Sequence, residues 1–162
     1  PMVDESERLL CLATDRCDVG CNALVCYVAT KLVFYQLEPT LLTKLYLPSA
    51  AEGTRLAPVL SLLSPELRIV VNTLEERWCR EVLHAVLGTL CFALGHILES
   101  PARDFSMSHR DLIRADLAQL ERFFLDGAIL QQQIVKYSVS PLYAQAEAAC
   151  GGTDLDGGAF AL

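Results

Sequence analysis

The longest regular pattern of apolar and polar positions in the chain runs from Ser64 to Glu99. Its first half places apolar residues at the three-then-four spacing of one helical face, with charged residues mostly on the other side. Ser64 and Pro65 suit a first turn, because serine caps free amides and proline has no amide to leave unpaired. The pattern predicts one long helix over residues 64–99. Its apolar positions are Leu67, Val70, Val71, Leu74, Trp78 and Val82.

The second half of this stretch, Val82 to Leu98, contains no charged residue. A helix that is apolar all round is either buried in a core or spans a membrane, and a span takes roughly 20 apolar residues. This run is shorter and includes two histidines and two glycines. We therefore expect a central helix packed on all sides. The alternative is insertion into a membrane, or binding of an apolar ligand, through residues 82–98. Gly88 and Gly95 would let another helix approach closely or would kink this one.

The rest of the chain also shows helical periods, and no segment alternates convincingly with period two, although a strand stays open near the end of residues 21–36. Ser108 and Gly127 stand where the caps of a strongly amphipathic helix belong. The sequence predicts an all-α array or bundle of six to seven helices around the central helix, with no internal repeat. The further helical segments are 4–14, 21–36, 38–46, 56–63, 108–126, 128–139 and 140–150, with a turn at 15–20 and a loop at 48–55.

A chain of 162 residues fits one compact domain. We expect a single helical domain over residues 1–150 and, because glycine is frequent after it, a disordered tail over 151–162. The 52% hydrophobic content is high and charged residues make up only 20%. This balance favours a surface covered by a partner, or a piece of a larger helical rod. The start at Pro1-Met2 carries no signal peptide, and we expect a cytoplasmic protein.

The net charge of −7 argues against nonspecific binding of nucleic acid, which needs a basic face. It also disfavours broad electrostatic docking onto anionic lipids. We therefore expect protein partners and no nucleic acid.

The seven cysteines mostly lie among apolar helical residues. We interpret them as buried free thiols that pack as small hydrophobic groups. A metal site between Cys11 and Cys26 is the alternative, but the paired CxxC spacing of zinc motifs is missing. We expect no metal.

Sequence motifs of common enzyme classes are missing as well. His84 and His96 lie about 120° apart on an ideal helix, so they do not share a face, and we expect both to be buried core groups. Carboxylate pairs occur at Glu75-Glu76 and at Asp111 with Asp116, where we expect wet helix faces and ordinary ion pairs. The sequence predicts no catalytic residues, no cofactor and no enzymatic activity.

Three aromatic residues, Trp78, Phe123 and Phe124, are candidates for a partner interface, because aromatic side chains dominate binding hot spots. They also continue apolar stripes, so a place in the core is the other interpretation.

Two stretches carry a family resemblance. Residues 74–78, Leu-Glu-Glu-Arg-Trp, precede the long apolar helix, and residues 117–127 read LAQLERFFLDG. They resemble the C-terminal part of the MUN domain, a helical module of vesicle-priming proteins related to exocyst-type tethering subunits, over about residues 64–130. The resemblance implies a stacked helical rod without enzymatic activity that docks vesicles and promotes SNARE assembly. Its implied partners are SNARE or small-GTPase proteins. Peripheral association with membranes is compatible with such a cytoplasmic role.

Together, these observations predict a non-enzymatic helical protein–protein interaction module, in vesicle tethering or priming and exocytosis. It would present helix faces and grooves to partner helices.

Overall fold

The computed structural model describes residues 5–37, 40–41, 44–47, 55–103, 105–126 and 130–151. Within these ranges the protein is all-α and has no strand, so the predicted helical array is confirmed, with five α-helices rather than six to seven. Of the predicted tail, Gly151 is instead the last residue of a helix, and residues 152–162 lie outside the described residues, as do residues 48–54 of the predicted loop. The helices are α1 (Glu5–Thr30), α3 (Leu56–Thr73), α4 (Glu76–Leu98), α5 (Met107–Leu125) and α6 (Gln132–Gly151), and a π-helical segment, η1 (Lys31–Gln36), continues α1.

The predicted helix over residues 64–99 is divided between α3 and α4. The backbone is extended at Leu74 (ψ 150°) and Glu75 (ψ 152°), which ends one helix and starts the next. The residues before the break, Val70 to Thr73, are β-branched or asparagine, and such residues have low helix propensity. Because α3 begins at Leu56, Ser64 and Pro65 lie inside it and do not cap a helix. The break allows α3 to fold back and contact α4.

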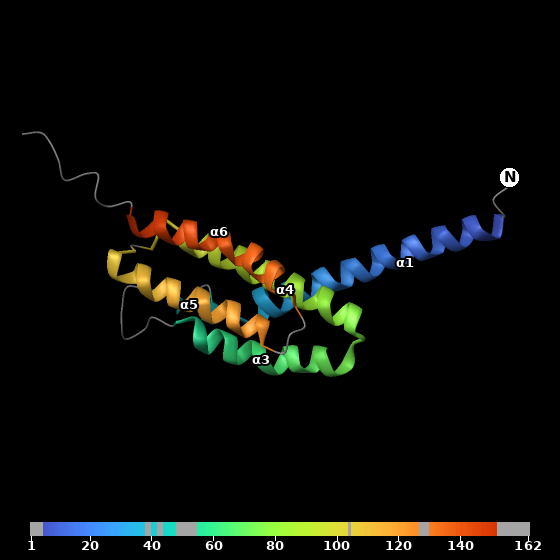
Figure 1. Cartoon of the computed structure of the whole chain (residues 1–162), viewed down its shortest axis with the longest axis horizontal. Coiled ribbons are helices and arrows are strands. Elements are labelled where there is room, and N and C mark those ends of the chain that lie inside the picture. The colour runs from blue at the N-terminus through green and yellow to red at the C-terminus, as the bar shows by residue number, and fades with distance from the viewer. Residues whose placement is uncertain are drawn as a thin grey trace, which may run out of the picture.

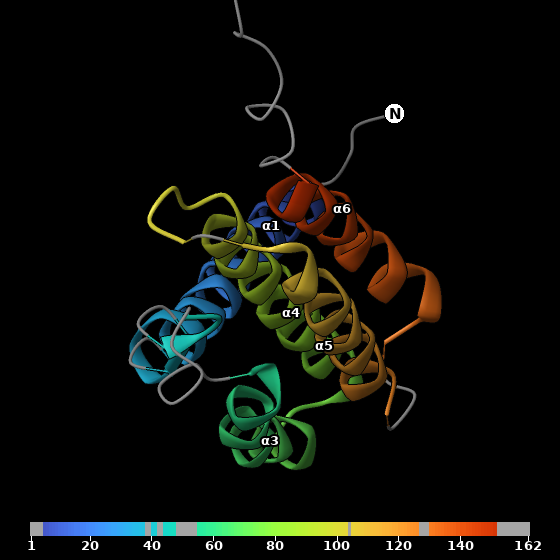
Figure 2. The same ribbon diagram turned by 90° about the vertical axis from the view of Figure 1, so that its left-hand side faces the viewer.

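The central helix of the array is α4, which contacts α1, η1, α3 and α6 (Figure 2). Most of its residues between Val82 and Leu98 are buried, as predicted. One side remains open, however, and the prediction that the helix is packed on all sides is too strong. The exposed residues of that side follow each other four apart: His84, Gly88, Phe92 and His96.

Of the two glycines in α4, only Gly95 lies close to another helix. A Cβ atom at Gly95 would meet the Oε1 atom of Gln145 in α6 at 3.1 Å. The Nε2 atom of Gln145 donates to the Glu99 carboxylate at 2.8 Å, which holds that side chain in place. At Gly88 a Cβ atom would meet open space. The close approach of another helix, expected at both glycines, is therefore found at Gly95 and not at Gly88.

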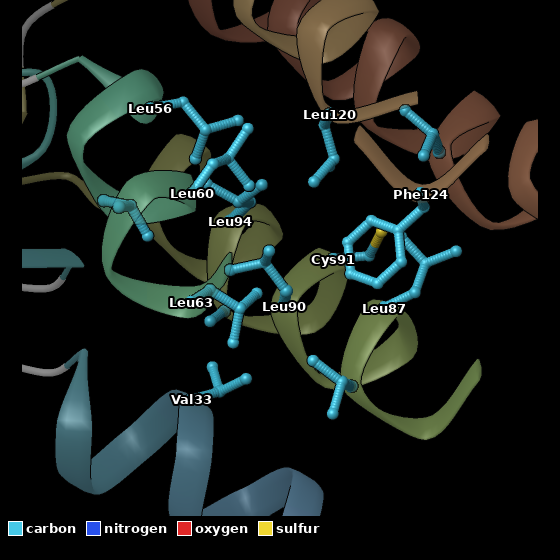
Figure 3. Close-up of a cluster of buried hydrophobic side chains, with 14 of the residues drawn as sticks. Val33, Leu56, Leu60, Leu63, Leu87, Leu90, Cys91, Leu94, Leu120 and Phe124 are labelled. Atoms are coloured by element: carbon cyan, nitrogen blue, oxygen red, sulfur yellow. The ribbon is translucent and has the colours of Figure 1, made fainter. Parts of the chain in front are cut away.

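One part of the core lies between α3, α4 and α5 (Figure 3), and buried residues of α6, such as Val135, Val139 and Leu142, continue it. Leu56, Leu60 and Leu63 project from α3 toward leucines of α4, with side chains of α5 on the other side. Fully burying one such side chain contributes about 1.5–3 kcal/mol, so this cluster accounts for much of the stability. The other labelled members of the cluster are Leu87, Leu90, Cys91 and Leu94 of α4, Leu120 and Phe124 of α5, and Val33 of η1.

The helix α1 runs without the turn predicted at residues 15–20, and it projects away from the other helices (Figure 1). Gly20 alone does not break it, and the charged residues near it are exposed or half-buried. Asp18 forms an ion pair of 3.6 Å with Arg77, which ties α1 to the start of α4. Ala29 is the buried residue of α1, so most of this helix lies outside the core.

The last two helices differ from prediction at their ends. The N-cap of α5 is Ser106, not Ser108, and its N–H donates to Nδ1 of His109 at 3.1 Å. The two helices predicted over residues 128–150 form the single helix α6, with Pro141 inside it. Proline has no N–H to donate to the carbonyl of Tyr137. Tyr137 itself is 85% exposed, so this part of α6 faces solvent.

Candidate interaction groove between α3 and α5

A groove runs between α3 and the C-terminal end of α5. It consists of two adjoining cavities of about 700 and 250 Å³, which share Ser64, Phe123 and Asp126 as lining residues. The α3 wall is one stripe along that helix, and the α5 wall is its last turns. The remaining lining residues are Ala57, Leu60, Ser61, Leu67, Arg68 and Val71 of α3, Leu83 of α4, and Gln119, Arg122, Phe124 and Leu125 of α5.

The two adjacent phenylalanines at the end of α5 lie in different environments, one beside the groove and one in the core. Phe123 is half-buried and lines both cavities, whereas Phe124 is 4% exposed and packs in the core. Their rings meet edge-on with centroids 5.3 Å apart, so Phe124 supports Phe123 from the core. Trp78 lies elsewhere, at the start of α4 beneath the guanidinium of Arg77 at 4.8 Å. An interface role for all three residues stays a prediction. Phe123 lines both cavities of the groove, and Phe124 lines only the smaller one.

The rim of the groove is basic. Arg68 and Arg122 are both exposed, and neither forms an ion pair with another residue in the part of the chain that the structure describes. Asp126 is the acidic residue in the lining of both cavities. An apolar floor with two arginines on its rim fits a helix that carries an apolar stripe and acidic flanking residues.

The two walls of the groove are joined by a buried carboxylate. Asp116 of α5 is 1% exposed. It accepts hydrogen bonds from the hydroxyl of Tyr46 at 3.1 Å and from the backbone N–H of Leu56 at 3.3 Å, and it forms an ion pair with Arg55. Arg55 also donates to the carbonyl of Leu112 at 3.2 Å. Since Leu56 is the first residue of α3, the carboxylate fixes the first turn of α3 to α5.

The expectation that Asp116 lies on a wet helix face is therefore wrong. The position follows Ile113 by three residues and precedes Leu120 by four, which places it on the inward stripe of α5. Burial and the neighbouring carboxylate raise the pKa of Tyr46 above its ordinary value, so Tyr46 stays a hydrogen-bond donor. The hydrogen bond with Asp116 raises the pKa of Arg55. This cluster serves to hold the two helices together.

Sequence reasoning missed this cluster, although one signal for it was present. An aspartate inside an apolar stripe indicates a buried carboxylate that needs partners. The partners, Tyr46 and Arg55, lie far from Asp116 in the chain, and no periodicity connects them.

The histidines of α4 are exposed, and the prediction that they are buried is wrong. Both lie on the open side of α4, and His96 meets the ring of Phe92 edge-on at 4.4 Å. His96 and Phe92 also line a smaller cavity, of about 320 Å³, between α4 and α6. Among the described residues, no group of three or more His, Cys, Asp or Glu side chains is placed to hold a metal ion.

The cysteines outside α1 are buried, as predicted, whereas the four cysteines of α1 are exposed or half-buried. The prediction that the cysteines are buried is therefore wrong for α1. That helix projects from the core, which leaves its cysteines exposed or half-buried. Burial raises the pKa of Cys91 to about 12, and such a thiol stays protonated and unreactive. All seven are free: Cys79, Cys91 and Cys150 are buried, Cys21 is half-buried, and Cys11, Cys17 and Cys26 are exposed.

Within the part of the chain that the structure describes, two helical segments are long and apolar enough to cross a membrane. Glu5–Gln36 is 17% buried over its most apolar window, and Glu76–Leu98 is 61% buried. Insertion of residues 82–98 into a membrane would expose the core between α3, α4 and α5. The structure thus favours the core interpretation of this segment.

One family model matches the chain: PATROL1-like, TPR repeats, over residues 3–143. The chain belongs to this family. The assignment to the MUN domain is therefore wrong, because the matching family model is a different one and extends well beyond residues 64–130. Leucine and aromatic residues at helical spacing recur in many helical arrays, so the likeness of residues 74–78 and 117–127 to the MUN domain does not distinguish that family from others. No curated protein and no solved structure matches the chain.

Membership in a family of TPR-like repeats makes the chain a helical protein-interaction module. Repeats of this kind are helix pairs, each of which packs on its neighbours. The pairs α3–α4 and α5–α6 have this form, and their helices contact one another. No repeated motif is visible in the sequence, because core positions in such pairs accept many apolar residues.

Proposed function

We propose that this PATROL1-like module acts in vesicle tethering or priming during exocytosis, and that the groove between α3 and α5 binds a helix of a partner protein. The proposed binding mode rests on the position of Phe123, a half-buried aromatic side chain that lines both cavities of the groove. Aromatic side chains in partly formed pockets are the usual anchors of a protein interface.

The occupant that fits is an amphipathic helix with an apolar stripe and acidic residues beside it. Its apolar stripe would cover Phe123 and Val71, and its acidic residues would pair with Arg68 and Arg122. SNARE or small-GTPase proteins are the proposed partners. PATROL1 is itself related to MUN-domain proteins, which supports the trafficking role. The module would work without enzymatic activity, in the cytoplasm and peripherally at membranes.

The test is a titration of the protein with fluorescent SNARE-helix peptides and with small GTPases. The Phe123→Asp variant should lose binding by about tenfold or more, because it places a charge in the apolar floor. Tyr137→Asp is the matched control, since Tyr137 is an 85% exposed aromatic residue on α6 that does not line the groove. It should bind as the unchanged protein does.

The two parts of the proposal fail separately. Binding that survives Phe123→Asp would reject the groove as the site and leave the trafficking role standing. A chain that captures neither SNARE helices nor small GTPases, yet binds an unrelated acidic amphipathic helix through Phe123, would reject the trafficking role and keep the groove.

A further inference from the structure

The helix α1 carries a second apolar surface, distinct from the groove. Six exposed positions without charge follow each other at spacings of three and four, the seam spacing of helices that pair lengthwise. We call them the α1 strip. At 3.6 residues per turn, every charged residue of α1 lies at least about 70° from its centre. The α1 strip consists of Leu10, Ala13, Cys17, Gly20, Leu24 and Tyr27.

The α1 strip is not the side of α1 that faces the bundle. That side is formed by Val25, Val28 and Ala29. Leu10, Leu24 and Tyr27 are 70%, 64% and 62% exposed. Large apolar side chains left open along a whole helix mark an interaction surface. Since α1 projects from the bundle, another helix has room along it (Figure 1).

The spacing of the positions in the α1 strip is symmetric about its centre. From the midpoint between Asp18 and Val19, each position has a counterpart at the same distance in the other direction. If two copies of α1 lie antiparallel about this point, every layer joins unlike partners: Leu10 with Tyr27, Ala13 with Leu24, and Cys17 with Gly20. A parallel pair would instead oppose Gly20 to Gly20 and Tyr27 to Tyr27, with a void at one layer and crowding at the other.

Charge favours the same arrangement. Glu5 and Glu7 lie in the first turn of α1, and the exposed Lys31 follows its last turn. In the antiparallel pair, Lys31 of one copy comes level with Glu5 and Glu7 of the other, twice by symmetry. In a parallel pair the acidic residues would lie beside each other, and so would the two lysines.

We propose that the α1 strip binds a second copy of this chain as an antiparallel helix pair. The contact is isologous, so it closes after two copies and forms a dimer. The six positions of the strip span about 26 Å at 1.5 Å per residue, a short seam, and the dimer should dissociate at micromolar concentrations.

The experiment is sedimentation velocity on the whole chain, from micromolar to millimolar concentration. The unchanged protein should pass from monomer to dimer, and Leu24→Glu should raise the dissociation constant by about tenfold or more, because each dimer contains the substitution twice. Val19→Glu is the matched control: Val19 is 70% exposed on α1 but outside the strip. Circular dichroism should show equal helicity in all three, since both residues are exposed.

The orientation is tested by exchanging charges. Lys31→Glu should weaken the dimer by about fivefold, since it creates two like-charged clusters. Adding Glu5→Lys and Glu7→Lys to that variant should restore the dissociation constant. A parallel pair would show no weakening on Lys31→Glu alone, and that result would overturn the proposal.

Three further results would also overturn it. One is a monomer at millimolar concentration. Another is a dimer that Val19→Glu weakens as much as Leu24→Glu does. The third is a monomer that binds neutral phosphatidylcholine vesicles through Leu24, which would assign the α1 strip to a membrane surface.

Discussion

The backbone N–H of Leu56 donates a hydrogen bond of 3.3 Å to the carboxylate of Asp116. The bond joins the first turn of α3 to the middle of α5. A carboxylate at a helix N-terminus accepts a hydrogen bond from a free backbone amide, and the positive end of the helix dipole stabilises its negative charge. Arg55 and Tyr46 complete the shell of the carboxylate. The relative position of the two groove walls therefore depends on one buried charge.

Replacing this charge should destabilise the protein more than replacing an exposed one. Asp116→Asn should lower the free energy of unfolding by about 2–4 kcal/mol, because Arg55 and Leu56 lose a charged acceptor. Asp111→Asn on the same helix, where the side chain is 82% exposed, should change it by less than about 0.5 kcal/mol. Urea unfolding followed by circular dichroism measures both. Equal effects would mean that the cluster does not join the helices.

The two phenylalanines at the end of α5 should separate stability from binding. Phe124→Ala should cost about 3–5 kcal/mol, since the residue is 4% exposed and its removal leaves a cavity. Phe123→Ala should cost distinctly less, because the ring is half-buried beside the groove. Thermal unfolding of the two variants gives the comparison. A larger loss for Phe123 would place that ring in the core and remove it as an anchor.

Alanine at the two glycines of α4 should have unequal effects. Gly88→Ala should stabilise the protein by about 0.5–1 kcal/mol, because alanine favours the helix and its Cβ meets open space. At Gly95 the same gain is opposed by the approach of Gln145, whose Oε1 atom would lie 3.1 Å from the new Cβ. Gly95→Ala should therefore gain less or lose stability. If Gly88→Ala and Gly95→Ala raised the unfolding midpoint equally, the side chain of Gln145 in α6 would not oppose a Cβ atom at Gly95.

Stability should fall on the alkaline side. Burial raises the pKa of Cys91 from 9.0 to about 12, so the folded state holds this proton more tightly than the unfolded state does. The stabilisation is complete below about pH 9 and is lost as the pH rises toward 12, by up to about 1.4 kcal/mol per pH unit for one thiol. Burial also raises the pKa of Cys79 and Cys150, which add to the slope.

Unfolding midpoints at pH 8, 9 and 10 test this linkage. At pH 10 unfolded tyrosine, whose ordinary pKa is about 10, adds to the decline, because burial also raises the pKa of Tyr46 in the folded state. Cys91→Ala should flatten the decline, whereas replacement of the exposed Cys11 by alanine should leave it unchanged. An unchanged slope in Cys91→Ala would assign the alkaline loss to other groups.

Helical periodicity predicted the fold class, because each helix buries one stripe and the stripes are visible in the sequence. It also placed the interior of the array in α4. The ends of helices were harder, since they depend on competition between weak local preferences and tertiary packing. The break at Leu74 is one example. Another is α6, which continues through Pro141 although the residue lacks a helical donor.

The candidate groove was only partly predictable. Phe123 was recognised from its residue type, but the groove needs α3 and α5 side by side, and that arrangement comes from contacts between distant segments. The same is true of Asp116, whose partners lie 60 or more residues earlier. Exposure of α1 could not be inferred either, because an apolar helix in isolation favours burial.

The separation of Leu56 and Asp116 by 60 positions also has a consequence for biosynthesis. A ribosome adds about 5–20 residues per second, so α3 emerges roughly 3–12 seconds before the carboxylate that receives its first amide. During that interval Arg55 lacks its partner, and the leucines of α3 lack the wall formed by α5. Completion of the second half of the chain therefore sets the moment at which the first half can become stable, and a nascent chain that pauses before Asp116 offers its apolar side to chaperones.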